Sequence, residues 1–206
     1  MSGITIIEDA DAADIADWLE ERLRGAEGRA AAISVPGGST PFPILQELAE
    51  RGLDASRLAV WPNDDRIVPE DHEASNTGKI RALLEPLGAE VVALAEGLAV
   101  PHFDLVWLGM GEDGHIASLF PNTDPQVDDS QPIRRLTPDP LPPHAPFDRI
   151  TLTIPSLLAT RELMFVIRGA EKRAVFEAAA RGESDLPVAR LLDAARVRGI
   201  PVTVFA

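Results

Sequence analysis

The chain has no cysteine among its 206 residues. This absence excludes disulfides, iron–sulfur clusters and thiolate zinc sites, and it rules out a cysteine nucleophile. Long apolar runs are also missing, because none approaches the roughly 18 residues that span a bilayer. The first residues, MSGITIIEDADAADIADWLE, place acids where a signal peptide is apolar. We therefore expect a cytoplasmic protein that does not enter a membrane.

Basic residues are scarce relative to acidic ones. The chain has 19 Lys and Arg against 33 Asp and Glu, a formal net charge of −14. Nucleic acids and anionic membranes attract basic surfaces, so this balance argues against both as partners. A small anionic substrate is still compatible with the charge, because it needs only a local group of donors and one or two cations.

The sequence contains no repeat and no long linker, so we expect a single α/β domain over residues 1–206. Apolar strands alternate with amphipathic helices, which favours a mostly parallel sheet with helices on both faces. Expected strands are 4–7, 29–35, 58–61, 90–94, 104–108, 150–154, 162–167 and 201–205. Expected helices are 11–24, 42–52, 76–85, 170–181 and 187–195, with a long surface loop at 121–147. Ligands of such folds bind beyond the carboxyl ends of the strands.

The first polar strand end is PGGSTP, after strand 29–35. Gly37 and Gly38 permit unusual backbone angles, Ser39 and Thr40 offer hydroxyls, and a helix opens at Pro41. Exposed amides at a helix start favour an anion such as phosphate. A well-capped strand–turn–helix connection explains the same letters equally well.

The second polar strand end, PNDDRIVPEDHEASN, follows strand 58–61. Arg66 is expected to reach the cleft as a cation, held by Asp64 or Asp65, with Asn76 near the next helix start. A solvated charged turn is the alternative interpretation.

The third strand end, GMGEDGHIASLFP, has the G-x-G-x-x-G spacing of a dinucleotide-binding loop at Gly109, Gly111 and Gly114. That interpretation requires a full helix and a second strand, but Pro121 ends the expected short helix early. The glycines are instead expected to form a tight turn that presents His115 as a general base. A capping or packing histidine is the alternative.

The fourth strand end, RGAEKR, places Arg168 and Lys172 around a helix start. A cation is disfavoured there, so Lys172 suggests an anion to bind, although solvent exposure also tolerates it. A metal site is poorly supported, because the histidines at 72, 102, 115 and 144 form no ligand pair. Ser118 lies outside any G-x-S-x-G nucleophile elbow.

Together the segments PGGSTP, DDRIVPEDHEASN, FDLVWLGMGEDGHIASLFP, DRITLTIP and GAEKRAVF resemble the 6-phosphogluconolactonase family in order and spacing, from about residue 30 to 195. The wider group also includes glucosamine-6-phosphate deaminases, which continue differently after the histidine. Three departures stand out: a shorter middle acid at Asp65, Ile116 in place of a threonine, and a short segment before residue 104.

The resemblance implies a modified Rossmann-like α/β fold and hydrolysis of 6-phosphoglucono-δ-lactone without metal or cofactor. We also expect the protein to be a monomer. It implies that His115 activates water and that Arg66, accompanied by Asp64, binds substrate or stabilises developing charge. The residues implied to bind the substrate and its phosphate are Gly37, Gly38, Ser39, Thr40, Asn76, Lys172 and Arg168.

Two other functions are known for related folds, and each requires a feature that the sequence can be searched for. A deaminase or sugar-phosphate isomerase needs an acid–base pair, which Asp64 and Asp65 could supply. A sugar-phosphate-sensing module of a transcription regulator needs a DNA-binding segment, for which the chain has no helix-turn-helix to spare.

Overall fold

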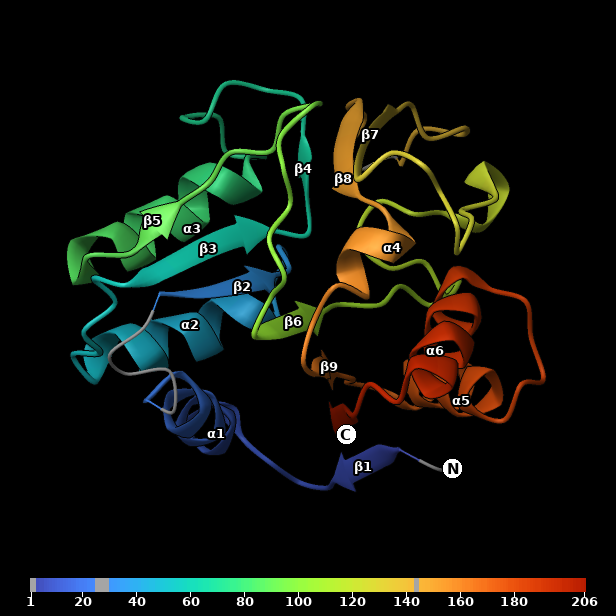
Figure 1. Ribbon diagram of the computed structural model, residues 1–206, viewed down its shortest axis with the longest axis horizontal. Helices are drawn as coiled ribbons and strands as arrows, with labels where there is room; N and C mark the ends of the chain where they lie inside the picture. The colour runs from blue at the N-terminus through green and yellow to red at the C-terminus, as the bar shows by residue number, and fades with distance from the viewer. Residues whose placement is uncertain (1–2, 25–29, 143–144) are drawn as a thin grey trace.

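The computed structural model describes residues 3–24, 30–142 and 145–206. Its centre is a parallel seven-stranded sheet in the order β1-β10-β9-β6-β2-β3-β5 (Figure 1). The strands are β1 Ile4–Ile7, β2 Ala31–Val35, β3 Leu58–Pro62, β5 Glu90–Val91, β6 Leu105–Leu108, β9 Leu163–Val166 and β10 Val202–Phe205. The four central strands are apolar and largely buried, as strands covered on both faces should be.

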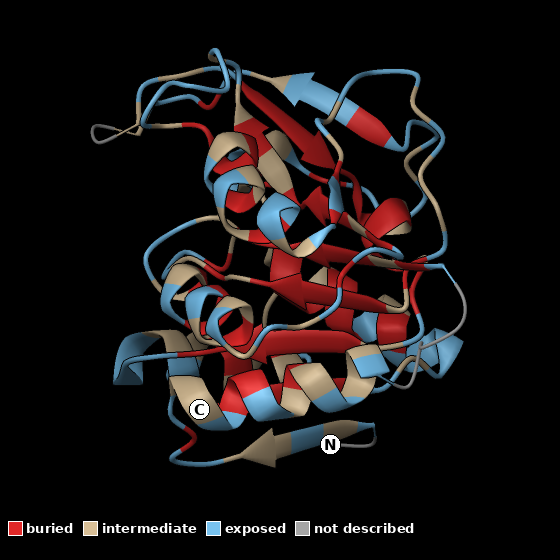
Figure 2. Ribbon diagram, turned by 90° about the vertical axis from the view of Figure 1, so that its left-hand side faces the viewer, coloured by how far each residue is buried: buried red, intermediate tan, exposed pale blue. Residues whose placement is uncertain are grey.

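Helices cover the sheet on both faces and create two apolar cores (Figure 2). Ile15, Ile44 and Ile80 place α1 Ala12–Arg24, α2 Pro41–Glu50 and α3 Asn76–Leu84 against one face. The other face of the sheet is covered by α4 Ile154–Leu157, α5 Ala170–Ala180 and α6 Pro187–Arg198, and Leu157 and Phe176 belong to the core on that side. This arrangement confirms the expected α/β fold, and its layers leave the carboxyl ends of β2, β3, β6 and β9 side by side.

A second, antiparallel sheet was not expected from the sequence. It has the order β4-β8-β7, formed by β4 Asp64–Arg66, β8 Arg149–Leu152 and β7 Ile133–Leu136. The three residues of β4 are all charged, so they show no apolar alternation that would indicate a strand. Their pairing with β8 gives them this conformation, and it brings two distant segments of the chain to the same strand ends.

Several expected boundaries are wrong for local physical reasons. The expected loop 121–147 contains β7 and a 3₁₀ turn at Pro121–Thr123. The expected strand 150–154 ends at Leu152, because Thr153 and Pro155 begin the short helix α4. The expected strand 90–94 ends at Val91. Position 29, the expected start of a strand, lies outside the described residues. None of the helices within the described ranges has the length and hydropathy to cross a membrane.

Candidate active site

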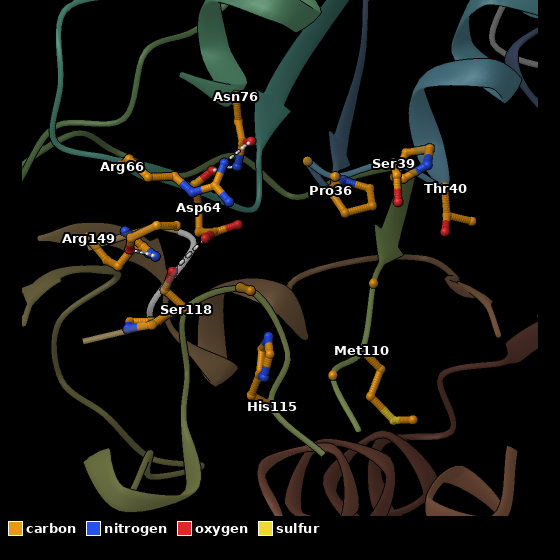
Figure 3. Close-up of a pocket in the computed structure, with 18 of the residues that line it drawn as sticks. Pro36, Ser39, Thr40, Asp64, Arg66, Asn76, Met110, His115, Ser118 and Arg149 are labelled. Carbon is orange, nitrogen blue, oxygen red and sulfur yellow. Dashed lines mark hydrogen bonds between the residues drawn. The ribbon is translucent and has the colours of Figure 1, made fainter. Parts of the chain in front are cut away.

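A cavity of about 370 Å³ opens at the carboxyl ends of β2, β3, β6 and β9 (Figure 3). Its position agrees with the rule for ligand sites in open α/β sheets. The expected site residues that line it are Gly37, Gly38, Ser39, Thr40, Asp64, Arg66, Asn76, His115 and Lys172. The structure therefore brings together the polar loops that follow four different strands.

One wall is the PGGSTP loop, which leads from β2 into α2. Thr40 is the N-cap of that helix, and its side chain makes no capping hydrogen bond. Gly37 passes so close to Asn76 that a Cβ there would lie 2.0 Å from the Asn76 Oδ1. Only glycine fits at this approach, so the loop and the Arg66–Asn76 segment form a continuous surface.

The opposite wall is fixed by the buried carboxylate of Asp65. Its Oδ1 accepts hydrogen bonds from the backbone N–H groups of Asn76 at 2.6 Å and Arg66 at 2.8 Å. Its Oδ2 accepts from the N–H of Thr77 at 2.8 Å and the hydroxyl of Ser75 at 3.2 Å. Asp65 thus satisfies the free amides at the start of α3, where a negative charge is favourable.

Arg66 is not held by Asp64 or Asp65 side chains, which corrects the expectation from the sequence. Its Nη1 donates to the Asn76 Oδ1 at 2.9 Å and to the Ala74 carbonyl at 3.0 Å. The acids act indirectly: Asp65 fixes the backbone of Asn76, and the Asp64 carbonyl accepts from the Asn76 Nδ2 at 3.0 Å. Asn76 is therefore the residue that orients the guanidinium at the cavity.

The side chain of Asp64 faces the cavity and accepts a hydrogen bond of 2.5 Å from the hydroxyl of Ser118. Burial raises the pKa of Asp64 above its ordinary value, while the Ser118 hydrogen bond and the Arg66 charge act in the opposite direction. The backbone N–H of Ser118 also donates to the Thr151 Oγ1 at 3.3 Å. Ser118 consequently links the loop that contains His115 to both β4 and β8.

His115 stands at the cavity with its Nδ1 2.6 Å from the Asp113 Oδ1. The His115 hydrogen bond lowers the pKa of Asp113, so this carboxylate is ionised and can only accept. The Nδ1 therefore donates to Asp113, and in the neutral imidazole the Nε2 has the free lone pair. A Cβ on Gly111 would lie 2.2 Å from the His115 Nδ1, which explains the glycine. The expected short helix after His115 is absent, and turns and isolated bridges replace it.

Arg168 and Lys172, the two cations expected at the site from the RGAEKR segment, lie in different places. Lys172 lines the cavity and also an adjoining space of about 630 Å³ that shares His115 and Phe120. Arg168 is absent from both linings, and its Nη2 donates to the Ala10 carbonyl at 2.5 Å. The expectation that Arg168 binds substrate thus lacks support from its position, because the hydrogen bond directs it toward the α1 side.

Sequence reasoning missed Asp113, Ser118 and Arg149 as site residues. Asp113 stands two positions before His115, a spacing that could have indicated its role. Arg149 is 3% exposed and lines the cavity from β8. A charged residue at the start of the RITL strand was its one signal in the sequence. Across residues 3–24, 30–142 and 145–206, no three His, Asp or Glu side chains gather as metal ligands. His144 lies outside these ranges.

Comparison with known proteins assigns the chain to a family. It matches the family described as glucosamine-6-phosphate isomerases/6-phosphogluconolactonase over residues 7–93 and 86–198. A 6-phosphogluconolactonase of Pseudomonas aeruginosa is 37% identical over 207 residues, covering 89% of this chain and 85% of that protein. One from Neisseria meningitidis serogroup A is 33% identical, covering 84% and 85%. The crystal structure of a Shewanella baltica 6-phosphogluconolactonase superposes with a TM-score of 0.76 at 26% identity, covering 99% and 97%. The chain belongs to the glucosamine-6-phosphate isomerase/6-phosphogluconolactonase family.

Proposed function

We propose that this protein hydrolyses 6-phosphoglucono-δ-lactone to 6-phosphogluconate, serving the pentose phosphate or Entner–Doudoroff pathway. The observation that supports this most directly is the His115–Asp113 pair, held at 2.6 Å beside a cavity that also contains Arg66 and Lys172. A base, a cation for the reacting end and a cation for a remote phosphate are the parts that hydrolysis of a phosphorylated lactone needs.

In the proposed reaction, the Nε2 of His115 removes a proton from water as its oxygen bonds to the lactone carbonyl carbon, C1. The Arg66 guanidinium stabilises the negative charge that develops on the carbonyl oxygen. The C1–O5 bond then breaks, and the ring oxygen O5 takes the proton from His115 to become a hydroxyl. The new carboxylic acid loses its own proton to solvent, and no covalent enzyme intermediate forms.

The remote phosphate of the substrate is proposed to bind at the start of α2. Gly37, Gly38, Ser39 and Thr40 offer amides and hydroxyls there, and Lys172 supplies a positive charge from α5. Binding energy from this distant group holds the lactone against His115. Asn76 contributes by orienting Arg66, and Asp64 completes the reacting end of the cavity.

The arrangement of the acids argues against a deaminase or isomerase. Such an enzyme needs an acid–base pair, but Asp65 accepts four hydrogen bonds, three of them from the start of α3, and is only 6% exposed. It is therefore occupied as a structural carboxylate and cannot share acid–base work with Asp64.

The test is an assay with lactone generated in situ by glucose-6-phosphate oxidation. Purified protein should accelerate lactone decay, and EDTA should leave the rate unchanged. Release of ammonia from glucosamine 6-phosphate, without lactone hydrolysis, would select the deaminase and contradict the proposal.

A further inference from the structure

Arg66 and Arg149 lie directly opposite each other on the antiparallel strands β4 and β8. Side chains of directly opposed residues project from the same face of such a pair, within about 4.5–5.5 Å at Cβ. Asp64 and Thr151, two positions along each strand, share that face. Both arginines and Asp64 line the cavity. Like charges placed in this way destabilise a sheet unless an anion balances them.

Among the described residues, few carboxylates are placed to balance the two positive charges of this arginine pair. Asp65 is engaged with the backbone of α3, and the exposed Asp148 accepts a hydrogen bond from Thr137. Asp64 is thus the one described carboxylate that shares the cavity face with both guanidiniums. Burial and the nearby Arg66 lower the pKa of Arg149, the direction expected for a cation crowded by another.

Arg149 is also held in a fixed orientation. Its Nη1 donates to the Phe147 carbonyl at 2.7 Å and its Nη2 to the Ala145 carbonyl at 2.8 Å. A planar guanidinium anchored through both terminal nitrogens loses little further freedom when an anion binds. This preorganisation is what a recognition group requires, and the same two bonds brace the loop at Ala145.

The arginine pair lies across the cavity from the proposed phosphate site. Figure 3 shows Arg66, Asp64 and Arg149 grouped on one side, Ser39 and Thr40 on the other, and His115 on the wall that joins them. The product of the proposed reaction has two anionic groups at opposite ends of a six-carbon chain. A cavity with donors at both ends matches that distribution of charge.

We propose that Arg149 forms, with Arg66, a second anion subsite that binds the C1 carboxylate of the product and the negative charge that develops on the carbonyl oxygen of C1 during hydrolysis. This inference rests on the proposed function and adds to it a specificity-determining residue from β8. It also assigns the orientation of the substrate, with C1 toward β4 and β8 and the phosphate toward α2.

The experiment measures direct binding, by titration calorimetry, of two ligands that differ at C1. 6-Phosphogluconate has a carboxylate there, and glucitol 6-phosphate has a hydroxymethyl group. Wild-type protein is expected to prefer 6-phosphogluconate by about 10- to 100-fold, the contribution of a charge-assisted hydrogen-bond pair. Arg149→Gln should remove most of this preference and leave the affinity for glucitol 6-phosphate within about 3-fold, because only the C1 contact is lost.

Two further variants separate recognition from bracing. Arg149→Lys keeps the charge and should retain part of the preference. Arg190→Gln is the matched control, because Arg190 also donates to a loop carbonyl, that of Pro125, but lies outside the cavity lining. It should retain the full preference, and circular dichroism checks that each variant is folded.

Two outcomes overturn the inference. A wild-type protein that binds both ligands equally has no carboxylate subsite, whatever the variants do. A loss of both affinities by the same factor in Arg149→Gln would mean that Arg149 braces the loop or contacts the phosphate. Because binding is measured without turnover, either result is distinguishable from failure of the lactonase assay.

Discussion

The Asp113 Oδ1 accepts a hydrogen bond from the His115 Nδ1 across 2.6 Å, and this contact fixes which ring nitrogen is free to remove a proton. Asp113 also accepts from the backbone N–H of His115 at 3.2 Å. The backbone hydrogen bond holds the Asp113 carboxylate in place, and the ring hydrogen bond orients the imidazole at the cavity. If His115 is the base, Asp113 is its positioning residue.

Replacement of Asp113 tests that dependence. We expect Asp113→Asn to lower kcat by roughly 10²-fold with little change in KM, because an amide can stabilise the wrong tautomer. Steady-state lactone hydrolysis measures both constants. Glu112→Gln is the matched control, since Glu112 is the neighbouring acid and does not line the main cavity. Equal kcat values for wild type and Asp113→Asn would show that Asp113 does not position His115 for catalysis.

Ser118 is expected to matter for both stability and turnover. Its buried hydroxyl donates to Asp64, so Ser118→Ala should lower the free energy of unfolding by about 1–3 kcal/mol. The kcat should fall about 10-fold, as expected when a site group is less firmly positioned. Denaturant titration and the lactone assay provide the two measurements.

The control for this variant is Ser156→Ala. Ser156 is also a buried serine, 5% exposed, and its hydroxyl donates to the Pro132 carbonyl at 2.7 Å. It should lose stability without losing kcat. If both variants reduced kcat equally, the effect would reflect general destabilisation and the linking role of Ser118 would be wrong.

The raised pKa of Asp64 should make the free energy of unfolding depend on pH. Burial raises the pKa of Asp64 above its ordinary value of 3.8. Between that value and the raised pKa, the folded protein binds more protons than the unfolded chain, so its stability falls as pH rises. We therefore expect the melting temperature of wild type to fall relative to that of Asp64→Asn, which cannot ionise, as pH rises from about 4 to 7. The fall should begin near about pH 4, where the carboxyl of the unfolded chain ionises.

The same variant should lose activity, because Asp64 lies at the reacting end of the cavity. A fall in kcat of roughly 10²-fold is expected for a group in acid–base or electrostatic contact with substrate. Asp71→Asn, at an exposed carboxyl, should change neither the melting temperature nor kcat. A wild-type melting temperature that does not fall relative to that of Asp64→Asn over this pH range would contradict the raised pKa of Asp64.

Lys172 tests the phosphate site. We expect Lys172→Ala to raise KM by about 10- to 100-fold while kcat changes less, because a charged contact to a non-reacting group is lost. Arg173→Ala removes a charge from the same turn, but Arg173 pairs with Glu8 and Glu177 outside the cavity. An unchanged KM in Lys172→Ala, or an equal change in Arg173→Ala, would argue for phosphate binding elsewhere.

Much of the site could be predicted because polar residues after apolar strands signal a parallel sheet edge. The loops with Gly37, Arg66 and His115 were found in this way, and the structure places all three at one cavity. The strand–helix alternation likewise predicted the central sheet. What was missed depends on long-range pairing: β4 forms only because Asp64, Asp65 and Arg66 meet β8, more than eighty residues later.

The side-chain partners were the least predictable part. Nothing local distinguishes Asp65, which caps α3, from Asp64, which faces the cavity, because the two are adjacent carboxylates. Their roles separate when the alternating directions of a strand send one side chain inward and the other to the cavity. The place of Arg149 at the site could not be predicted for a similar reason, because it depends on the register between β4 and β8.

The role of His115 as general base is tested by the rate at which His115→Gln hydrolyses lactone generated in situ, compared with the rate of wild type. With His115 as the base, kcat should fall by about 10²- to 10⁴-fold, the contribution of a general base, while KM for the lactone stays within a few-fold. A His115→Gln protein with near wild-type kcat would contradict the assignment of His115 as the base that activates water.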